Sequence, residues 1–185
     1  MAYFFFDYKD EQKQDLRALL VSLLVQLSNQ SDSFCDILHG YHSMHQRGSL
    51  QPKESELIKC LKDMLKIPGG IPVYLIVDAL DECSKTGVQS SREDVVELLL
   101  QLVGLKLPNL RLCFTSRPEI DIRMSLGPLV STYTSILLHD ERGQQHDIEN
   151  YINFVVSSRK FNTTGWTDED KKLVIDTLSR RAGCM

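Results

Sequence analysis

Three carboxylates follow an apolar run in the middle of the chain, and their types and spacing are suited to chemistry. The run is Val73–Val77, and Asp78, Asp81 and Glu82 come directly after it. Carboxylates at the carboxyl end of a parallel strand lie where open α/β sheets bind ligands. In phosphoryl-transfer enzymes the first Asp of such a group holds Mg²⁺, and the acidic residues after it orient or deprotonate water. The pattern therefore indicates Asp78 as a metal ligand and Asp81 and Glu82 as catalytic residues.

A structural interpretation fits the same three residues equally well. In it, Asp81 and Glu82 cap the next turn, and backbone N–H groups satisfy Asp78. Single acidic strand ends are common in α/β proteins, so the pattern alone leaves both interpretations open.

A second apolar run, Leu110–Phe114, ends in Thr115, Ser116, Arg117 and Pro118. A guanidinium group offers a rigid fork of donors that matches phosphate oxygens, so Arg117 can contact a terminal phosphate. We assign Ser116, beside it, to the same cofactor-binding role. The alternative is that Arg117 is an ordinary surface or salt-bridged arginine. The presence of the carboxylates after the other strand favours the interpretation as a phosphate ligand.

The elements that position these residues alternate between short apolar runs and longer amphipathic segments. This alternation predicts an α/β fold, a parallel sheet covered by helices. The run at 73–77 lacks an alternating pattern, which predicts a central strand that is buried on both faces. The segment from 30 to 51 is polar and is interpreted as a loop, and Pro52 is expected to open the helix after it. Strands are predicted over 3–6, 73–77, 110–114 and 133–138, and helices over 10–29, 52–67, 95–104 and 148–155 and from 168 onward.

Composition excludes several classes of function. The 21 Lys and Arg against 25 Asp and Glu are scattered, so we expect no nucleic-acid partner. No apolar stretch approaches the ~20 residues that a membrane-spanning helix needs, so we expect no membrane partner. The N-terminus has no basic segment before an apolar one, which argues against a signal peptide and predicts a cytoplasmic protein.

The cysteines and histidines raise one further possibility, a metal site. The five cysteines are odd in number and form no C-x₂-C pair, so they are interpreted as reduced thiols. Cys35, His39, His42 and His45 recur at helical or near-helical spacing and are a candidate metal cluster, although a partly exposed helix gives the same spacing by chance. We favour the chance interpretation.

Four segments together carry a family resemblance: Tyr3–Asp10, Asp78–Cys83, Thr115–Glu119 and Asp147–Ile152. They resemble, in order, the NACHT family of STAND signalling NTPases, of the fungal type found with nephrocystin-like N-terminal domains and ankyrin repeats. The resemblance spans nearly the whole chain. It implies a three-layer, P-loop NTPase-like parallel sheet that binds Mg²⁺ with ATP or GTP.

The resemblance also implies a role for each candidate residue. Asp78 resembles the Walker B magnesium residue, Asp81 and Glu82 resemble the acidic pair that positions water, and Arg117 resembles the sensor arginine.

The chain departs from the family pattern at the phosphate-binding loop. A P-loop enzyme needs G-x-x-x-x-G-K-[ST], and no lysine in this sequence follows a glycine. In the family this loop precedes the strand predicted at 3–6, so we expect a sheet whose first strand and P-loop are absent. We also expect a chain truncated at both ends, with an NTPase core over 1–160 and the start of a helical lid over 161–185. Loss of the strand beside the arginine-bearing strand would leave unpaired edges, so a robust monomer is not expected.

Three functions are compatible with these observations. The first is a partial NACHT module, a nucleotide-dependent oligomerisation switch in the full-length protein that is itself unable to hydrolyse nucleotide, because the phosphate cradle is missing. The second is a degenerate interaction module that pairs with other NACHT or repeat-containing chains or with copies of itself. The third is a metal-dependent hydrolase that uses Asp78, Asp81 and Glu82. Whether the chain is an enzyme is left open.

Overall fold

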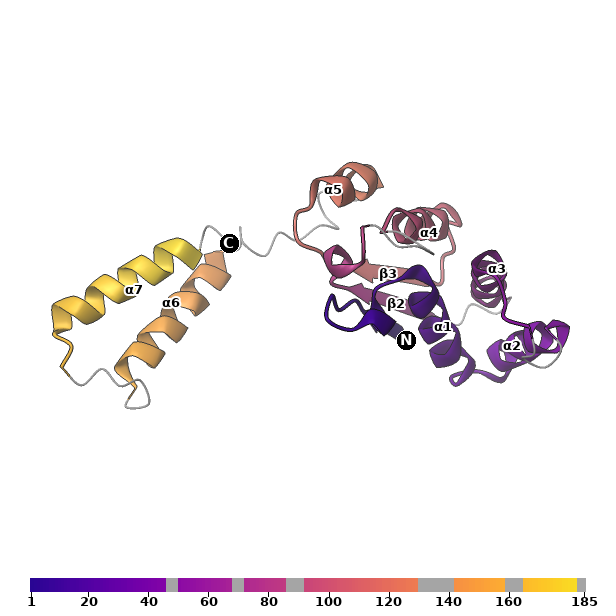
Figure 1. The fold of residues 1–185 in the computed structure, drawn as a ribbon, viewed down its shortest axis with the longest axis horizontal. Coiled ribbons are helices and arrows are strands. Elements are labelled where there is room, and N and C mark those ends of the chain that lie inside the picture. Colours follow the sequence, from indigo (N-terminus) through magenta and orange to yellow (C-terminus); the bar gives the residue numbers. More distant parts are fainter. Residues whose placement is uncertain (46–49, 68–71, 86–91, 130–141, 159–164, 183–185) are drawn as a thin grey trace. The chain divides into compact units, whose positions relative to one another are not determined.

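The structure, a computed structural model, describes residues 1–45, 50–67, 72–85, 92–129, 142–158 and 165–182 (Figure 1). The chain divides into two compact units, Met1–Leu129 and Val130–Met185. The first contains a parallel sheet with helices and the second a pair of helices, so the predicted α/β class is confirmed for the first unit. The predicted division into a core over 1–160 and a lid over 161–185 is a functional division, and it stays a prediction.

Three parallel strands form the sheet of the first unit. They are β1 (Ala2–Phe5), β2 (Val73–Asp78) and β3 (Leu110–Phe114), in the order β1-β2-β3. Three of the predicted strands are thus confirmed, with β2 at the centre. Because the strands are parallel, their carboxyl ends meet at one edge of the sheet. The fourth predicted strand, at 133–138, lies outside the described residues.

Helices cover one face of this sheet. Both connections step across the sheet in the same direction, so right-handed crossovers place their helices on the same side. The three long helices of this layer are α1 (Leu16–Ser28), α3 (Glu54–Leu65) and α4 (Arg92–Gly104). Their leucines pack on every second residue of the strands. The strand residues in this core are Ala2, Phe4, Val73, Leu75 and Val77, with Leu110, Leu112 and Phe114 partly buried against it.

The opposite face of the sheet stays open in the described part of the first unit. Tyr3, Phe5 and Tyr74 on this face are 47%, 50% and 51% exposed. The prediction that β2 is buried on both faces is wrong here, because β2 alternates between buried and more exposed residues and the helices of both connections lie on one side. The three-layer arrangement stays a prediction.

The first helix begins later than the sequence suggested. Asp10 caps only a 3-10 turn, η1 (Glu11–Lys13), by accepting a hydrogen bond from Gln12 N at 3.0 Å. The α-helix begins after Asp15, whose side chain accepts from Ala18 N at 2.8 Å. Both carboxylates offer the same kind of cap, and only the path of the chain decides which one starts the long helix.

The predicted loop between residues 30 and 51 is wrong in part. Helix α2 (Asp32–Met44) occupies most of it. Phe34 is buried, and Ile37, Leu38 and Tyr41 pack against the core. This spacing is an amphipathic stripe, although Gly40 and the histidines gave the segment a polar composition. The next helix, α3, starts at Glu54, so Pro52 precedes the helix and does not open it.

Two further helices form the second unit. They are α6 (Arg142–Ser157) and α7 (Asp168–Ala182), which pack against each other, and both were predicted.

A short helix, α5 (Ile120–Leu126), and the 3-10 turn η4 (Gly127–Leu129) end the first unit. Among the described residues, no helix combines the length and the apolar character that crossing a membrane requires.

Candidate functional site

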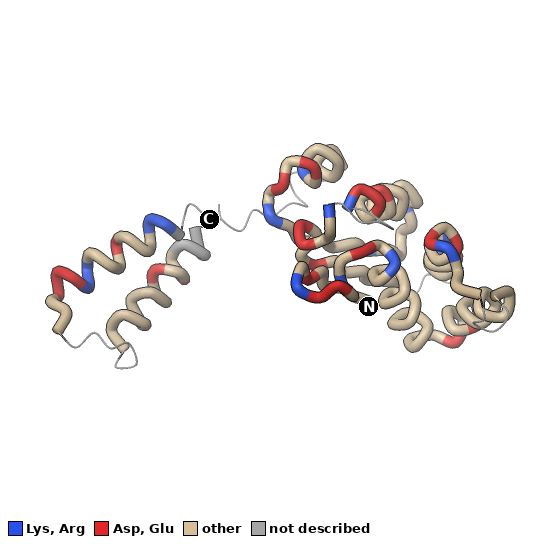
Figure 2. The backbone as a smooth tube through the Cα atoms, in the orientation of Figure 1, with Lys and Arg blue, Asp and Glu red and all other residues tan. Residues whose placement is uncertain are grey.

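The predicted site residues lie at the carboxyl ends of β2 and β3. Figure 2 shows acidic and basic segments close together in the loops of the first unit. The register pairs Val77 with Phe114, so the next residues, Asp78 and Thr115, stand opposite each other. The hydroxyl of Thr115 donates a hydrogen bond to Asp78 Oδ1 and accepts one from Ala79 N at 3.1 Å. A carboxylate and a hydroxyl on neighbouring strands are thus fixed side by side.

Asp81 and Arg117 form the second link between these strand ends. Arg117 N donates to Asp81 Oδ1 at 2.9 Å, and Arg117 Nε lies 3.4 Å from Asp81 Oδ2. The Asp81 side chain is only 9% exposed, whereas that of Arg117 is 77% exposed. Both oxygens of Asp81 are therefore engaged in holding the arginine segment, while the guanidinium group projects into solvent.

Glu82 makes the third link, toward the first strand. Its Oε2 accepts a hydrogen bond from Tyr8 N at 3.3 Å. The carboxylate sits in a 3-10 turn, η3 (Leu80–Glu82), which is closed by a bond from Glu82 N to Ala79 O at 2.8 Å. Each of the three carboxylates thus joins the end of β2 to the end of a neighbouring strand.

The predicted cofactor-binding role of Ser116 stays a prediction. Ser116 Oγ donates to Arg117 O at 2.6 Å, within its own segment. Thr115 is the hydroxyl that reaches Asp78. The strand register decides which hydroxyl faces the carboxylate, and the pattern of residue types does not predict this register.

Arg92 is a site residue that sequence reasoning missed. It is 4% exposed and is the one buried charged residue of the described chain. Its guanidinium donates to Asp81 O, to Cys83 O at 3.1 and 3.3 Å, and to Asp121 Oδ2 at 3.1 Å. It therefore clamps the acidic turn to the start of α5. One signal in the sequence could have found it. The helix dipole disfavours a cation in the first turn of a helix, so an arginine at this position indicates that another interaction holds it there.

The backbone at the acidic turn is strained. Ala79, between Asp78 and η3, adopts a left-handed conformation with φ of 53°. A residue with a Cβ atom pays roughly 1–2 kcal/mol for this conformation. The hydrogen bonds from Ala79 N to Thr115 Oγ1 and from Leu80 N to Thr115 O at 3.0 Å hold the turn in place.

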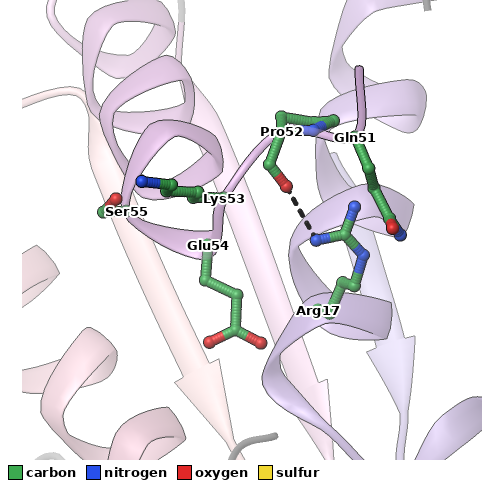
Figure 3. Close-up of a pocket in the computed structure, with 6 residues that line it drawn as sticks. All are labelled: Arg17, Gln51, Pro52, Lys53, Glu54 and Ser55. Carbon is green, nitrogen blue, oxygen red and sulfur yellow. Dashed lines mark hydrogen bonds between the residues drawn. The ribbon is translucent and has the colours of Figure 1, made fainter. Parts of the chain in front are cut away.

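A separate hollow lies between α1 and the start of α3 and contains none of the predicted site residues. Figure 3 shows Arg17 reaching toward Pro52, whose carbonyl accepts from Arg17 Nη1 at 2.9 Å. When the oxygen and nitrogen of the Gln51 side-chain amide exchange places, its oxygen accepts hydrogen bonds from Arg17 Nε and Nη2 at 3.2 and 3.0 Å. Burial, followed by the charges of Asp15 and Asp94, raises the pKa of Glu54, which also lines the hollow. Because each guanidinium nitrogen of Arg17 bonds to the chain itself, we interpret this hollow as a packing feature.

Neither candidate metal cluster converges in the structure. Within the described ranges, no group of three or more His, Cys, Asp or Glu side chains is placed to hold a metal ion. This applies to the group of Cys35 with His39, His42 and His45, and to Asp78 with Asp81 and Glu82. The hydrolase interpretation therefore gains no geometric support. The four described cysteines are free thiols.

Comparison with known proteins gives one family. The model of the family described as nephrocystin 3, N-terminal, matches residues 1–117. The chain belongs to this family. The matched part of the chain runs from Met1 to Arg117, so it contains every residue that was predicted for the site. A search of curated proteins and a search of solved structures find no match. The nephrocystin-like part of the resemblance is thus confirmed, and the NACHT, fungal and ankyrin-associated parts stay predictions.

Proposed function

We propose that this chain supplies the magnesium and sensor side of a nucleotide-dependent signalling switch of the NACHT type, which changes its oligomeric state in the full-length protein. The observation that supports this most strongly is the pairing of the acidic end of β2 with the end of the neighbouring strand: Asp78 bonds to the hydroxyl of Thr115, and Asp81 bonds to Arg117. Ligands of open α/β sheets bind at such strand ends.

The residues present fit a magnesium ion. Mg²⁺ prefers oxygen ligands and keeps several of its waters, so it needs only one or two carboxylates from the protein. Thr115 donates to Oδ1 of Asp78, and its hydrogen bond orients the carboxylate. In the complete site Mg²⁺ would neutralise charge on the nucleotide phosphates. The phosphate-binding loop has to come from a segment that this sequence does not contain.

Arg117 is the residue that we propose to sense the terminal phosphate of ATP or GTP. Its guanidinium group is largely exposed, and only Nε faces Asp81. A phosphate near the strand ends would compete with Asp81 for this group, because phosphate oxygens match the guanidinium fork. Release of Asp81 would then alter the tie between β2 and β3. The contact of Asp81 with Arg117 is thereby proposed as the element that responds to nucleotide.

A second candidate function, a non-catalytic interaction module, is favoured by one observation. Both oxygens of Asp81 and one oxygen of Glu82 already bond to the chain itself. Carboxylates whose oxygens bond to the chain itself hold loops together, and a non-catalytic interaction module also needs its loops to be held in place. On this alternative the chain pairs with other NACHT or repeat-containing chains and binds no nucleotide.

Binding of fluorescent ATP and GTP in the presence of Mg²⁺ tests the two functions. We would measure this chain beside a version extended upstream to an in-frame G-x-x-x-x-G-K-[ST], and follow oligomeric mass by light scattering. We expect the extended version to bind at least tenfold more tightly than this chain and to change its mass with nucleotide.

Variants of the extended version assign the residues. Asp78→Asn and Arg117→Ala should each weaken binding about tenfold or more, the effect of losing one charge-assisted contact. Arg111→Ala is the matched control, because Arg111 is an exposed arginine on β3 that bonds only to nearby carbonyls. Equal binding by the control and both site variants would contradict the proposed function and favour the interaction module.

A further inference from the structure

The outer edge of β1 is occupied by two side chains of the chain itself. β1 is an edge strand of the sheet that the described residues form, since the order of this sheet is β1-β2-β3. Gln26 on α1 pairs with Tyr3 as a neighbouring strand would: Tyr3 N donates to Gln26 Oε1 at 3.0 Å, and Gln26 Nε2 donates to Tyr3 O at 2.6 Å. Gln30 repeats this one step along, and its Nε2 donates to Met1 O at 2.8 Å.

The amides of both glutamines are held in one orientation. The second hydrogen of Gln26 Nε2 goes to Ser22 Oγ at 2.9 Å, and that of Gln30 Nε2 goes to Gln26 O at 2.7 Å. Each amide nitrogen thus gives one bond to the segment Met1–Tyr3 and one to α1. The side chains therefore form a connected row and not two isolated surface contacts.

Helix and strand geometry explain why this row fits. Four residues of an α-helix rise about 6 Å, and two residues of a strand rise about 6.6 Å. Gln26 on α1 and Gln30, two residues after its end, can therefore meet the backbone of Tyr3 on β1 and of Met1 just before it. The third position of the row holds Ser22, which is too short to reach Phe5 in the same way, so the row covers Met1 and Tyr3.

The protected segment is the part of the chain most suited to pairing with its own copy. Ala2–Phe6 contains four aromatic residues and no charge, and Tyr3 and Phe5 stack edge to face on the open side of the sheet at 5.4 Å. Uncharged, aromatic edge strands are templates for strand addition and aggregation. On β3, the described residues supply one comparable side-chain contact, from Arg111 Nη1 to Leu110 O at 3.0 Å.

We propose that Gln26 and Gln30 act as a side-chain strand that closes the β1 edge against a second copy of this chain. Their amides take up the donors and acceptors to which a copy of Ala2–Phe6 would otherwise bind. With the amides removed, the β1 edge becomes a docking site for the same strand of another molecule. This proposal does not depend on nucleotide binding.

The test compares Gln26→Ala/Gln30→Ala with the parent chain by amide hydrogen exchange and by light scattering. At low concentration, exchange of the Tyr3 amide should become about tenfold faster, the change expected for one net hydrogen bond. As concentration rises, the mass of the variant should increase and its Tyr3 amide should regain protection. The parent should show a protected Tyr3 amide at every concentration.

A second variant separates edge pairing from simple unfolding. Gln26→Glu/Gln30→Glu also loses the donors to β1, but its charges should keep copies apart, so it should stay at the mass of the parent. Equal association of both variants would mean that unfolding drives it and would overturn the proposal. Two results for the alanine variant would also overturn the proposal. In the first, its Tyr3 amide stays protected from exchange; in the second, this amide exchanges faster but the mass of the variant does not rise with concentration.

Discussion

At the scale of residues, the acidic group after β2 is a set of links more than a set of free ligands. Asp78 bonds to Thr115, Asp81 to Arg117 and Glu82 to Tyr8. Carboxylates that accept hydrogen bonds from neighbouring segments fix the loops around them, and such fixed loops are what a ligand site at strand ends needs. The candidate site is thus built by its own residues, with Arg92 as the buried support beneath it.

Replacement of Arg92 should be the most costly single change at the site. Arg92→Ala would leave the carbonyls of Asp81 and Cys83 without donors, and each buried unpaired group costs roughly 1–3 kcal/mol. We expect the free energy of unfolding in urea to fall by about 3 kcal/mol. Arg123→Ala, an exposed arginine on α5, should stay within about 0.5 kcal/mol of the parent. Similar losses for both variants would contradict the clamp.

The left-handed backbone at Ala79 gives a prediction of its own. Ala79→Gly removes the conformational strain but adds freedom to the unfolded chain, so its stability should lie within about 1 kcal/mol of the parent. Ala79→Val should lose about 2 kcal/mol, since a β-branched residue disfavours positive φ strongly. Urea unfolding of both variants measures the difference, and equal stability of the two would mean that Ala79 is not left-handed in solution.

At the scale of elements, side-chain bonds fix how the helices of the outer layer meet. Tyr41 of α2 donates to Asp63 of α3 at 2.7 Å. Burial, followed by this bond to the carboxylate, raises the pKa of Tyr41. His45, just after α2, lies 3.1 Å from Glu56 of α3. The helix that the sequence missed is therefore joined to α3 at two points.

The contact of His45 with Glu56 should make stability depend on pH. The hydrogen bond of the His45 ring to Tyr41 O, followed by Glu56, raises the pKa of His45 above its ordinary 6.5. The bond from Lys53 N, followed by His45, lowers the pKa of Glu56 below its ordinary 4.5. A raised histidine pKa adds stability below pH 6.5 that is lost as pH rises through the higher folded value, and a lowered carboxyl pKa adds stability above pH 4.5 that is lost on acidification.

The contribution of the pair should therefore be largest between about pH 4.5 and 6.5. The measurement is the urea midpoint of the parent and of His45→Gln across pH 4 to 9. The difference between the two should shrink as pH rises above neutrality. A difference that is constant over this range would show that the histidine charge plays no part.

At the scale of the whole molecule, the hydrophobic core belongs to one unit. Every residue of the main buried cluster lies between Ala2 and Leu126, within the unit Met1–Leu129. In the second unit, Val156 is buried, whereas Tyr151, Phe154 and Leu173 are more than 60% exposed. A pair of helices whose described residues include one buried side chain offers little area to stabilise it alone.

Residues 1–129 should therefore fold without the rest of the chain. We expect this segment to unfold in one cooperative transition in urea, with far-UV circular dichroism and tyrosine fluorescence changing together. Residues 130–185 alone should show weak helicity without a cooperative transition. A segment 1–129 that fails to unfold cooperatively would show that residues beyond Leu129 complete the core.

The sequence by itself determined the elements whose pattern is local. Apolar runs predicted the three described strands, and leucine periodicity predicted α1, α3 and α4, because burial of one helix face imposes this period on the residues. The same patterns placed Asp78, Asp81, Glu82 and Arg117 at strand ends, and these ends do meet.

Only the tertiary structure decided how those residues pair. The register sets Thr115, and not Ser116, against Asp78, and the chain path chooses Asp15 over Asp10 as the cap of α1. The clamp of Arg92 and the glutamine row on β1 join residues 9 to 29 positions apart along the chain. Such contacts depend on the relative placement of whole elements. The periodicity of the local sequence does not predict this placement.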